Sequence, residues 1–414
     1  MRQLKKMTVN YKHNFRLDSG SFFVLYTSLV MMCYLLPVLK ITIPYIHVAL
    51  LMLVFFPIAM IKMQNNLGFF IVMLVATSLS TIFYFVNGIY GLSDAINEAI
   101  RYIRFFLPVL WTLFALRYCS IKQQRHMLII FGIVMSFILI NTIIALEHDS
   151  WIARILAQDK TTDTTEIRAY RMGNVGGFEF SYMMGIVVIC LTWAAIQCQN
   201  VLGKILFVIG AVVGFYYIIQ TMYMTLLILT AFSILALLLF NIKSVYSKIV
   251  IVIGSIVTFF SLAPIFKYLS ELFSGSLLST KFFQFYTMMT GGGVDSLGSR
   301  PALIMDAIQR WLKSPLWGGY DTSVRTHSFV FSTLEATGLI GFFAFLWCMW
   351  WAYKSILSEL RKKDVETILL SVVFLYVFAL AVLNPIGYVF EVTISAFFIT
   401  PLWSALIGAG DHIL

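Results

Sequence analysis

Arg300 closes a glycine-rich loop and stands where helical spacing of apolar residues begins. The stretch 291–301 reads GGGVDSLGSRP, and the apolar residues after it recur at the spacing of one helix face as far as Lys313. The first N–H groups of a helix lack partners within it, and a guanidinium adds a planar fork of donors. We therefore expect Arg300 to bind a diphosphate. The sequence leaves open the alternative that Arg300 only faces lipid headgroups.

His327 is the best candidate for a general base. It follows Thr326, a candidate helix cap, at the start of the longest predicted span. The positive end of a helix dipole disfavours the charged imidazolium, so a histidine there can stay neutral and accept a proton near neutral pH. The competing interpretation, which is the commoner case for a single histidine, is an interfacial residue without chemistry.

Glu335 follows His327 by eight residues in the same predicted span. A continuous helix would place it about 12 Å deeper than His327. An unpaired acid is costly at such a depth in a membrane. The sequence therefore predicts a partner for Glu335, and an arginine is the natural choice.

Five further arginines lie at predicted outer span ends or in long outer loops: Arg101, Arg104, Arg168, Arg171 and Arg325. Arg101 and Arg104 share a helix face, and snorkelling is slightly the better explanation for them. Arg168 and Arg171 stand near glycines and could grip a lipid-linked diphosphate, although a solvated basic face explains them equally well. Because outer arginines do not help to orient a membrane protein, these residues and Arg300 together indicate an external anionic ligand.

The elements that position these residues are predicted to be membrane-spanning helices. Of the 414 residues, 60% are hydrophobic and 12% are charged, against roughly 25% charged in a soluble domain. Water-soluble folds are therefore excluded, and a β-barrel is excluded because long apolar runs such as 22–39 do not alternate. The five cysteines show no metal-type spacing, and we interpret them as packing residues. The first apolar run lacks a cleavage site and is interpreted as a retained span.

Hydropathy predicts an all-α polytopic membrane protein with about twelve spans in a single integral membrane domain, 1–414. The approximate spans are 20–39, 43–61, 67–86, 100–118, 127–146, 179–198, 201–219, 222–241, 249–266, 327–352, 366–383 and 391–408. Two outer loops, 147–178 and 267–326, are too long to be simple connectors. The second contains a predicted interfacial helix at about 301–313, with Trp311 on its apolar face and Asp306, Arg310 and Lys313 on the other.

The distribution of charge predicts the orientation. Of the 29 lysines and arginines, 16 fall on the side that holds both termini, but only 5 of the 19 acids do. The positive-inside rule makes that side cytoplasmic. Membrane insertion thus accounts for the overall charge of +10, and no nucleic-acid partner is expected. The sequence has no Asp-x-Asp, no His-Glu-x-x-His and no Walker loop, which favours a mechanism without metal or cofactor.

An ordered series of short motifs follows Arg300. The series is Ser299-Arg300, the amphipathic helix, Pro315-Leu316-Trp317-Gly318-Gly319, His327-Ser328 and Gly338-Leu339-Ile340-Gly341. It resembles the signature region of the bacterial O-antigen ligase and polymerase superfamily. The twelve-span layout is also similar, and Arg168 and Arg171 look like the second basic loop of that family. The chain departs from the commonest form of the motif at Ser328, where asparagine is usual, and at Gly318-Gly319, where the usual motif is Gly-x-Gly.

The resemblance implies a membrane-embedded, GT-C-like glycosyltransferase of the bacterial plasma (inner) membrane, with both termini cytoplasmic and the active site on the outer face. The donor would be an undecaprenyl-diphosphate-linked oligosaccharide, and a chain-length regulator is a further candidate partner. His327 would deprotonate or position the acceptor hydroxyl, while Arg300 and one of Arg168 or Arg171 neutralise charge on the leaving diphosphate. In a polymerase the acceptor is another lipid-linked repeat unit, and in a ligase it is lipid A core. Ser328 leans weakly toward a polymerase.

A secondary transporter with twelve spans is the strongest alternative from another class. The span count and Asn384-Pro385, which could break the eleventh span, favour it. Ion-coupled transporters usually carry ionisable residues near the middle of the bilayer, whereas Glu335 and Glu391 lie near outer helix ends. A structural scaffold would leave the outer arginines and the His327 segment unexplained. We therefore expect glycosyl transfer.

Overall fold

The computed structural model describes nine stretches of the chain and a few isolated residues between them. The stretches are 19–43, 107–149, 165–221, 223–242, 244–275, 295–318, 328–363, 365–384 and 390–408. These stretches are helical, and they contain no strand. The predicted spans 43–61 and 67–86 lie almost wholly outside them.

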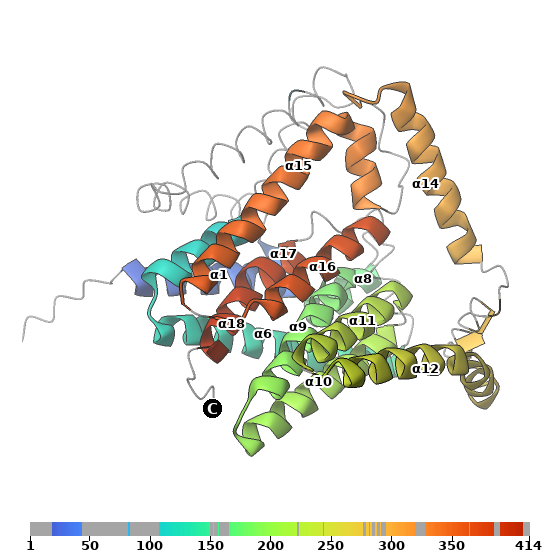
Figure 1. Ribbon diagram of the computed structural model, residues 1–414, viewed down its shortest axis with the longest axis horizontal. Coiled ribbons are helices and arrows are strands. Elements are labelled where there is room, and N and C mark those ends of the chain that lie inside the picture. Colours follow the sequence, from blue (N-terminus) through green and yellow to red (C-terminus); the bar gives the residue numbers. More distant parts are fainter. Residues whose placement is uncertain are drawn as a thin grey trace, which may run out of the picture.

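Figure 1 shows the described helices, coloured in chain order from blue to red. They are α1 (Ser19–Leu35), α2 (Pro37–Thr42), the helix Leu107–Tyr118, α6 (Ile121–His148), α8 (Thr165–Met172), α9 (Phe178–Gln197), α10 (Val201–Thr221), α11 (Met224–Asn241), α12 (Val245–Leu272), α14 (Asp295–Lys313), α15 (Phe329–Arg361), α16 (Ile368–Leu383), α17 (Phe390–Ile394), the π-helix η2 (Ser395–Ile399) and α18 (Thr400–Gly408).

Five helical segments of the described stretches are long and apolar enough to cross a membrane: α6, α9, α10, α15 and the continuous segment Phe390–Gly408. Four shorter apolar helices accompany them: Gly20–Leu35, Leu107–Tyr118, Thr225–Asn241 and Ile368–Leu383. All nine coincide with predicted spans. The chain is therefore an all-helical protein with the apolar helices of a membrane protein.

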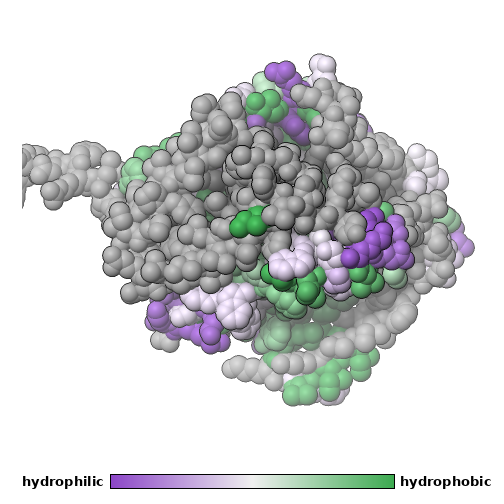
Figure 2. Space-filling model, turned by 90° about the horizontal axis from the view of Figure 1, so that it is seen from above, coloured by the Kyte–Doolittle hydropathy of each residue, from purple (hydrophilic) through white to green (hydrophobic). Residues whose placement is uncertain are grey.

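The outward faces of these helices are apolar. On α10, Val201, Leu202, Ile209 and Val212 each expose more than half of their surface. Figure 2 shows such hydrophobic residues in green on the described surface, beside patches of hydrophilic residues in purple. A contiguous apolar surface of this kind is unfavourable in water and favourable against lipid tails. The exposed side chains thus mark the lipid-facing surface.

Helix α9 lies inside the bundle, with α10, α11 and α17 packed against it. Its length is buried almost throughout, and Gly185 is one reason for the close packing. A Cβ at Gly185 would collide with the hydroxyl of Tyr376 on α16, which donates to the carbonyl oxygen of Tyr182 at 3.3 Å. Small residues at such contacts let transmembrane helices approach closely.

Helix α6 begins six residues before the predicted span 127–146. Ser120 and Gln123 form a capping box, in which the Ser120 Oγ accepts from the Gln123 backbone N–H at 3.3 Å and the Gln123 Oε1 accepts from the Ser120 N–H at 2.8 Å. This reciprocal cap satisfies two N–H groups at the helix start. Hydropathy did not predict this earlier start, because the basic residues after Ser120 are typical of a connecting segment.

Helix α15 is not the continuous span that the sequence predicted over 327–352. Gly338 interrupts it with φ 62° and ψ −168°, and Figure 1 shows its short first part meeting its long second part at a sharp bend. Because the bend follows Glu335, the helical rise between His327 and Glu335 is not affected by it, and the expected rise of about 12 Å stays a prediction, since His327 lies outside the described residues. Hydropathy did not predict the bend because it averages over about 20 residues, and a single glycine hardly changes that average.

Candidate functional site

Helix α14 begins at Asp295, six residues before the predicted start at 301. An acid in the first turn suits the positive end of a helix dipole, which explains the earlier start. Arg300 consequently lies in the second turn of α14 rather than at its N-terminus, so the N–H groups that lack helical partners belong to 295–298. The prediction that Arg300 stands at the N-terminus of this helix is therefore wrong. The side chain of Arg300 lies outside what the structure describes.

The predicted amphipathic character of α14 holds in part. Ala307 is buried on the expected apolar face, whereas Leu312 on that face is 58% exposed. Arg310, which was expected on the side opposite the apolar face, is partly buried against α15. Arg310 turns toward α15 because it forms an ion pair with Glu335 of that helix.

Arg310 is the partner that Glu335 was predicted to need. Its Nε lies 2.5 Å from Glu335 Oε1, and its Nη2 lies 3.5 Å from Glu335 Oε2. The Glu335 side chain is fully buried, and that of Arg310 is 22% exposed. Two donors on two carboxylate oxygens fix the orientation as well as the charge. The pair thereby attaches α14 to the first part of α15.

A turn after α14 makes a second attachment, at the bend of α15. The carbonyl oxygen of Pro315 accepts from Leu339 N–H at 2.9 Å, and that of Leu316 accepts from Ile340 N–H at 3.3 Å. These two N–H groups follow Gly338, where the helix is broken and cannot supply its own acceptors. The turn therefore satisfies the backbone groups that the bend exposes.

Two glycines allow the turn and the bend to touch. Gly318 has φ 67°, and a Cβ on it would lie 2.5 Å from Gly338 N and 2.6 Å from Ala336 O. A Cβ on Gly338 would collide with Leu316 O and lie 2.6 Å from Gly318 N. Both backbones adopt a positive φ that side chains disfavour. Two motifs singled out in the sequence, at 315–319 and 338–341, thus form one contact.

The start of α15 is fixed to the end of α16. Ser328 is buried and caps α15, since its Oγ accepts from Phe331 N–H at 3.3 Å. Phe329 N–H donates to Asn384 O at 3.1 Å. The cap is therefore Ser328, not Thr326 as expected, so His327 precedes the cap in sequence. Asn384 is buried, and its Nδ2 finds no acceptor among the described residues.

Arg168 and Arg171 lie on α8, a short helix in the predicted outer loop 147–178. Arg168 is exposed and Arg171 is half-buried. Helix α8 packs against α2, and the residues after it complete the contact: Asn174, at φ 58°, accepts from Val38 N–H at 3.3 Å. Asparagine tolerates this left-handed conformation better than most residues. The two arginines are thus held at the α2 end of the bundle.

An ion pair that the sequence analysis missed lies beside α8. Lys40 at the end of α2 binds Glu391 at the start of α17, and Glu391 is almost fully buried. Both residues were expected at outer span ends, which was the one signal that could have paired them. A buried acid at a helix end requires a cation nearby. The pair connects the first and last described helical segments.

The remaining candidates, Arg101, Arg104, Arg325 and His327, lie outside the described residues. The chain matches no protein-family model and no curated protein. The described part of the candidate site is therefore a frame, meaning a set of helix contacts that fixes the segments carrying the candidate residues. It anchors α14, which carries Arg300, and it fixes Gly318 and Ser328, the residues on either side of the segment with Arg325 and His327.

Proposed function

We propose that the protein is a polysaccharide polymerase that joins undecaprenyl-diphosphate-linked repeat units on the outer face of the bacterial plasma membrane. The supporting observation is the contact between Pro315–Gly318 and Gly338–Ile340, reinforced by Arg310 and Glu335. These motifs carry the resemblance to the O-antigen ligase and polymerase superfamily, and they meet in space as parts of one functional unit would. The proposal includes about twelve spans in a GT-C-like arrangement, with both termini cytoplasmic.

The proposed reaction is an inverting glycosyl transfer without a metal. His327 accepts the proton of an acceptor sugar hydroxyl while that oxygen attacks the anomeric carbon of the donor. The bond from the anomeric carbon to the diphosphate oxygen breaks, and the undecaprenyl diphosphate leaves with the electron pair. Arg300 and one of Arg168 or Arg171 stabilise its charge, and Arg101, Arg104 and Arg325 contribute to binding the anionic donor.

The test is a polymerisation assay with purified protein in detergent. Undecaprenyl-diphosphate-linked repeat units, without metal or nucleotide, should give a ladder of products on a gel. The His327→Ala variant should form roughly 10²- to 10⁴-fold less product, the range for loss of a general base. The Arg300→Ala variant should form roughly 10²- to 10³-fold less, the range for loss of one donor that stabilises developing charge. His148→Ala, at an exposed histidine in the last turn of α6, is the matched control and should retain the ladder.

Three other outcomes would change the proposal. Transfer of glycan onto lipid A core, without a ladder, would identify a ligase that uses the same frame. No transfer to either acceptor, with folded protein, would contradict glycosyl transfer and favour a transporter. Full activity of His327→Ala or Arg300→Ala would remove the role assigned to that residue.

A further inference from the structure

The opposite end of α15 from Gly338 borders a basic cleft of about 580 Å³. Its lining residues come from the end of the helix Leu107–Tyr118 and from one stripe of α15: Arg117, Tyr118, Trp351, Lys354, Ser355, Ser358, Glu359 and Lys362. Three cations and one carboxylate give this lining a net charge of +2. The proposed glycosyl transfer does not use any of these residues.

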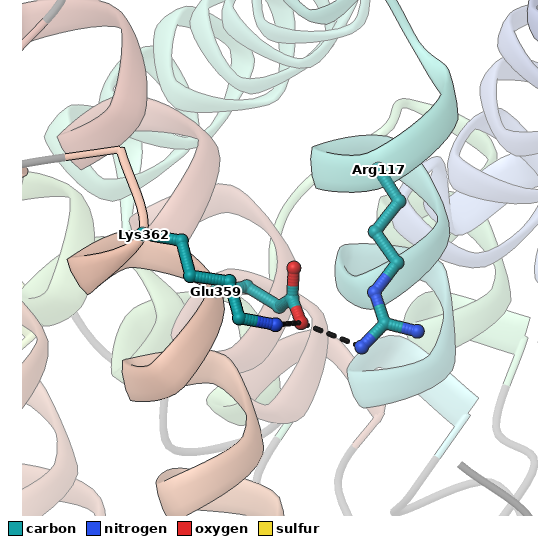
Figure 3. Close-up of polar contacts among 3 residues, drawn as sticks. All are labelled: Arg117, Glu359 and Lys362. Carbon is teal, nitrogen blue, oxygen red and sulfur yellow. Dashed lines mark hydrogen bonds and ion pairs between the residues drawn. The ribbon is translucent and has the colours of Figure 1, made fainter. Parts of the chain in front are cut away.

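Glu359 binds two of the three cations of the cleft and fixes their positions, while the lining keeps a net positive charge. Figure 3 shows its carboxylate between Arg117 of one helix and Lys362 of its own. Glu359 Oε1 lies 2.5 Å from Arg117 Nη2 and 2.9 Å from Lys362 Nζ. The ion pair with buried Glu359 holds the guanidinium of Arg117 beside α15, where it lines the cleft.

Lys354 forms no ion pair with any residue that the structure describes, and it is exposed at the cleft. Lys362, the residue that follows the end of α15, lines the same cleft as Lys354. Serine hydroxyls at 355 and 358 lie between them. The lining therefore presents ammonium groups and hydroxyl donors, which is the chemistry that binds a phosphate.

The surface next to the cleft is suited to a lipid. Phe343, Trp347 and Trp350 each expose more than half of their surface, and their spacing places them on one stripe of α15 that continues to Lys354. From Phe343 to Lys354 the helix rises about 16 Å, close to the half-thickness of about 15 Å of a bilayer core. An acyl chain along this stripe would bring its headgroup to Lys354.

We propose that this cleft binds the headgroup of an anionic phospholipid in the leaflet that the positive-inside rule makes cytoplasmic. The phosphodiester lies between Lys354 and Lys362 with Arg117 behind it, and Trp351 and Tyr118 lie at headgroup level, as aromatic residues do at membrane interfaces. Basic pockets between transmembrane helices on this side of a membrane bind such headgroups. A soluble phosphate has the same anionic chemistry but gains nothing from the apolar stripe.

The test measures lipid binding to the full-length protein in detergent by native mass spectrometry, with phosphatidylglycerol and phosphatidylcholine as probes. Wild-type protein should retain phosphatidylglycerol in preference to phosphatidylcholine. The double variant Lys354→Gln/Lys362→Gln should bind phosphatidylglycerol about 25-fold more weakly, from about fivefold for each lysine near a membrane surface. The matched control is Lys122→Gln/Lys204→Gln, which removes two exposed lysines from the same predicted side but outside the cleft.

Three results would overturn the proposal. Equal weakening in the control variant would show that overall charge, not the cleft, attracts the lipid. Equal binding of the two lipids by the wild type would exclude recognition of the anionic headgroup. Displacement of phosphatidylglycerol by millimolar inorganic phosphate, lost in Lys354→Gln/Lys362→Gln, would identify a soluble phosphate as the occupant. Monodisperse elution of each variant on size exclusion shows that the comparison is between folded proteins.

Discussion

Replacement of Arg310 by alanine is expected to lower the free energy of unfolding by about 3 kcal/mol and to abolish product formation. The variant leaves Glu335, which is fully buried, without its arginine. Removing one partner of a buried pair costs about 3–5 kcal/mol, because the remaining buried charge loses the hydrogen bonds and the opposite charge of that partner. We expect the lower end of this range, since Arg310 keeps 22% of its side chain exposed. Thermal unfolding of the purified protein measures the loss as a lower Tm.

A double variant separates the charge from the packing. In Arg310→Met/Glu335→Leu both charges are absent and apolar volume remains, so most of the lost stability should return. Gln309→Ala, at an exposed position of the same helix, is the matched control and should lie within about 0.5 kcal/mol of wild type. An Arg310→Ala variant as stable as Gln309→Ala would refute the buried pair as a stabilising contact.

Hydropathy predicted the helices whose ends coincide with a change in polarity. The predicted span 179–198 is α9, Phe178–Gln197, because Glu179 and the polar residues after Gln197 bound an uninterrupted apolar run. Hydropathy could not predict the bend at Gly338. It depends on the carbonyl oxygens of Pro315 and Leu316, which replace helical acceptors from outside the helix. The sequence pattern around Gly338 does not show that these two carbonyl oxygens will lie next to it.

The sequence predicted those features of the candidate site that follow from the free-energy cost of burying one residue. The cost of an unpaired buried acid predicted that Glu335 has a basic partner, but not that Arg310 of the amphipathic helix would turn inward to meet it. The pair of Lys40 and Glu391 joins residues 351 positions apart in the sequence. Both residues were expected at outer span ends, but other charged residues such as Arg101 share that expectation, so only the packing of α2 against its surroundings identifies the pair.

Replacement of Gly338 by alanine is expected to destabilise the protein by at least 3 kcal/mol and to eliminate activity. Its backbone, at φ 62° and ψ −168°, lies in a region that is essentially restricted to glycine, where other residues incur about 1–3 kcal/mol of strain. The added Cβ would also collide with the backbone at Leu316, which cannot rotate away as a side chain can. A lower Tm and loss of the product ladder are the expected readouts.

Gly132→Ala is the matched control for this substitution. Gly132 lies within α6, and a Cβ there would meet no atom within 4 Å, so alanine should be neutral or stabilise the helix by up to about 1 kcal/mol. If Gly338→Ala unfolded at the same temperature as Gly132→Ala, the bend in α15 would be refuted.

Gly318→Ala should resemble Gly338→Ala, because its Cβ would meet the backbone of Ala336 and Gly338 on the other side of the same contact. The double variant Gly318→Ala/Gly338→Ala should then cost less than the sum of the two single variants. Once the turn has separated from the bend, the second Cβ no longer has a backbone to strike, and substitutions that share one contact are not additive. Additive losses of Tm would instead mean that the two glycines act at separate places, and that the motifs at 315–319 and 338–341 do not form one unit.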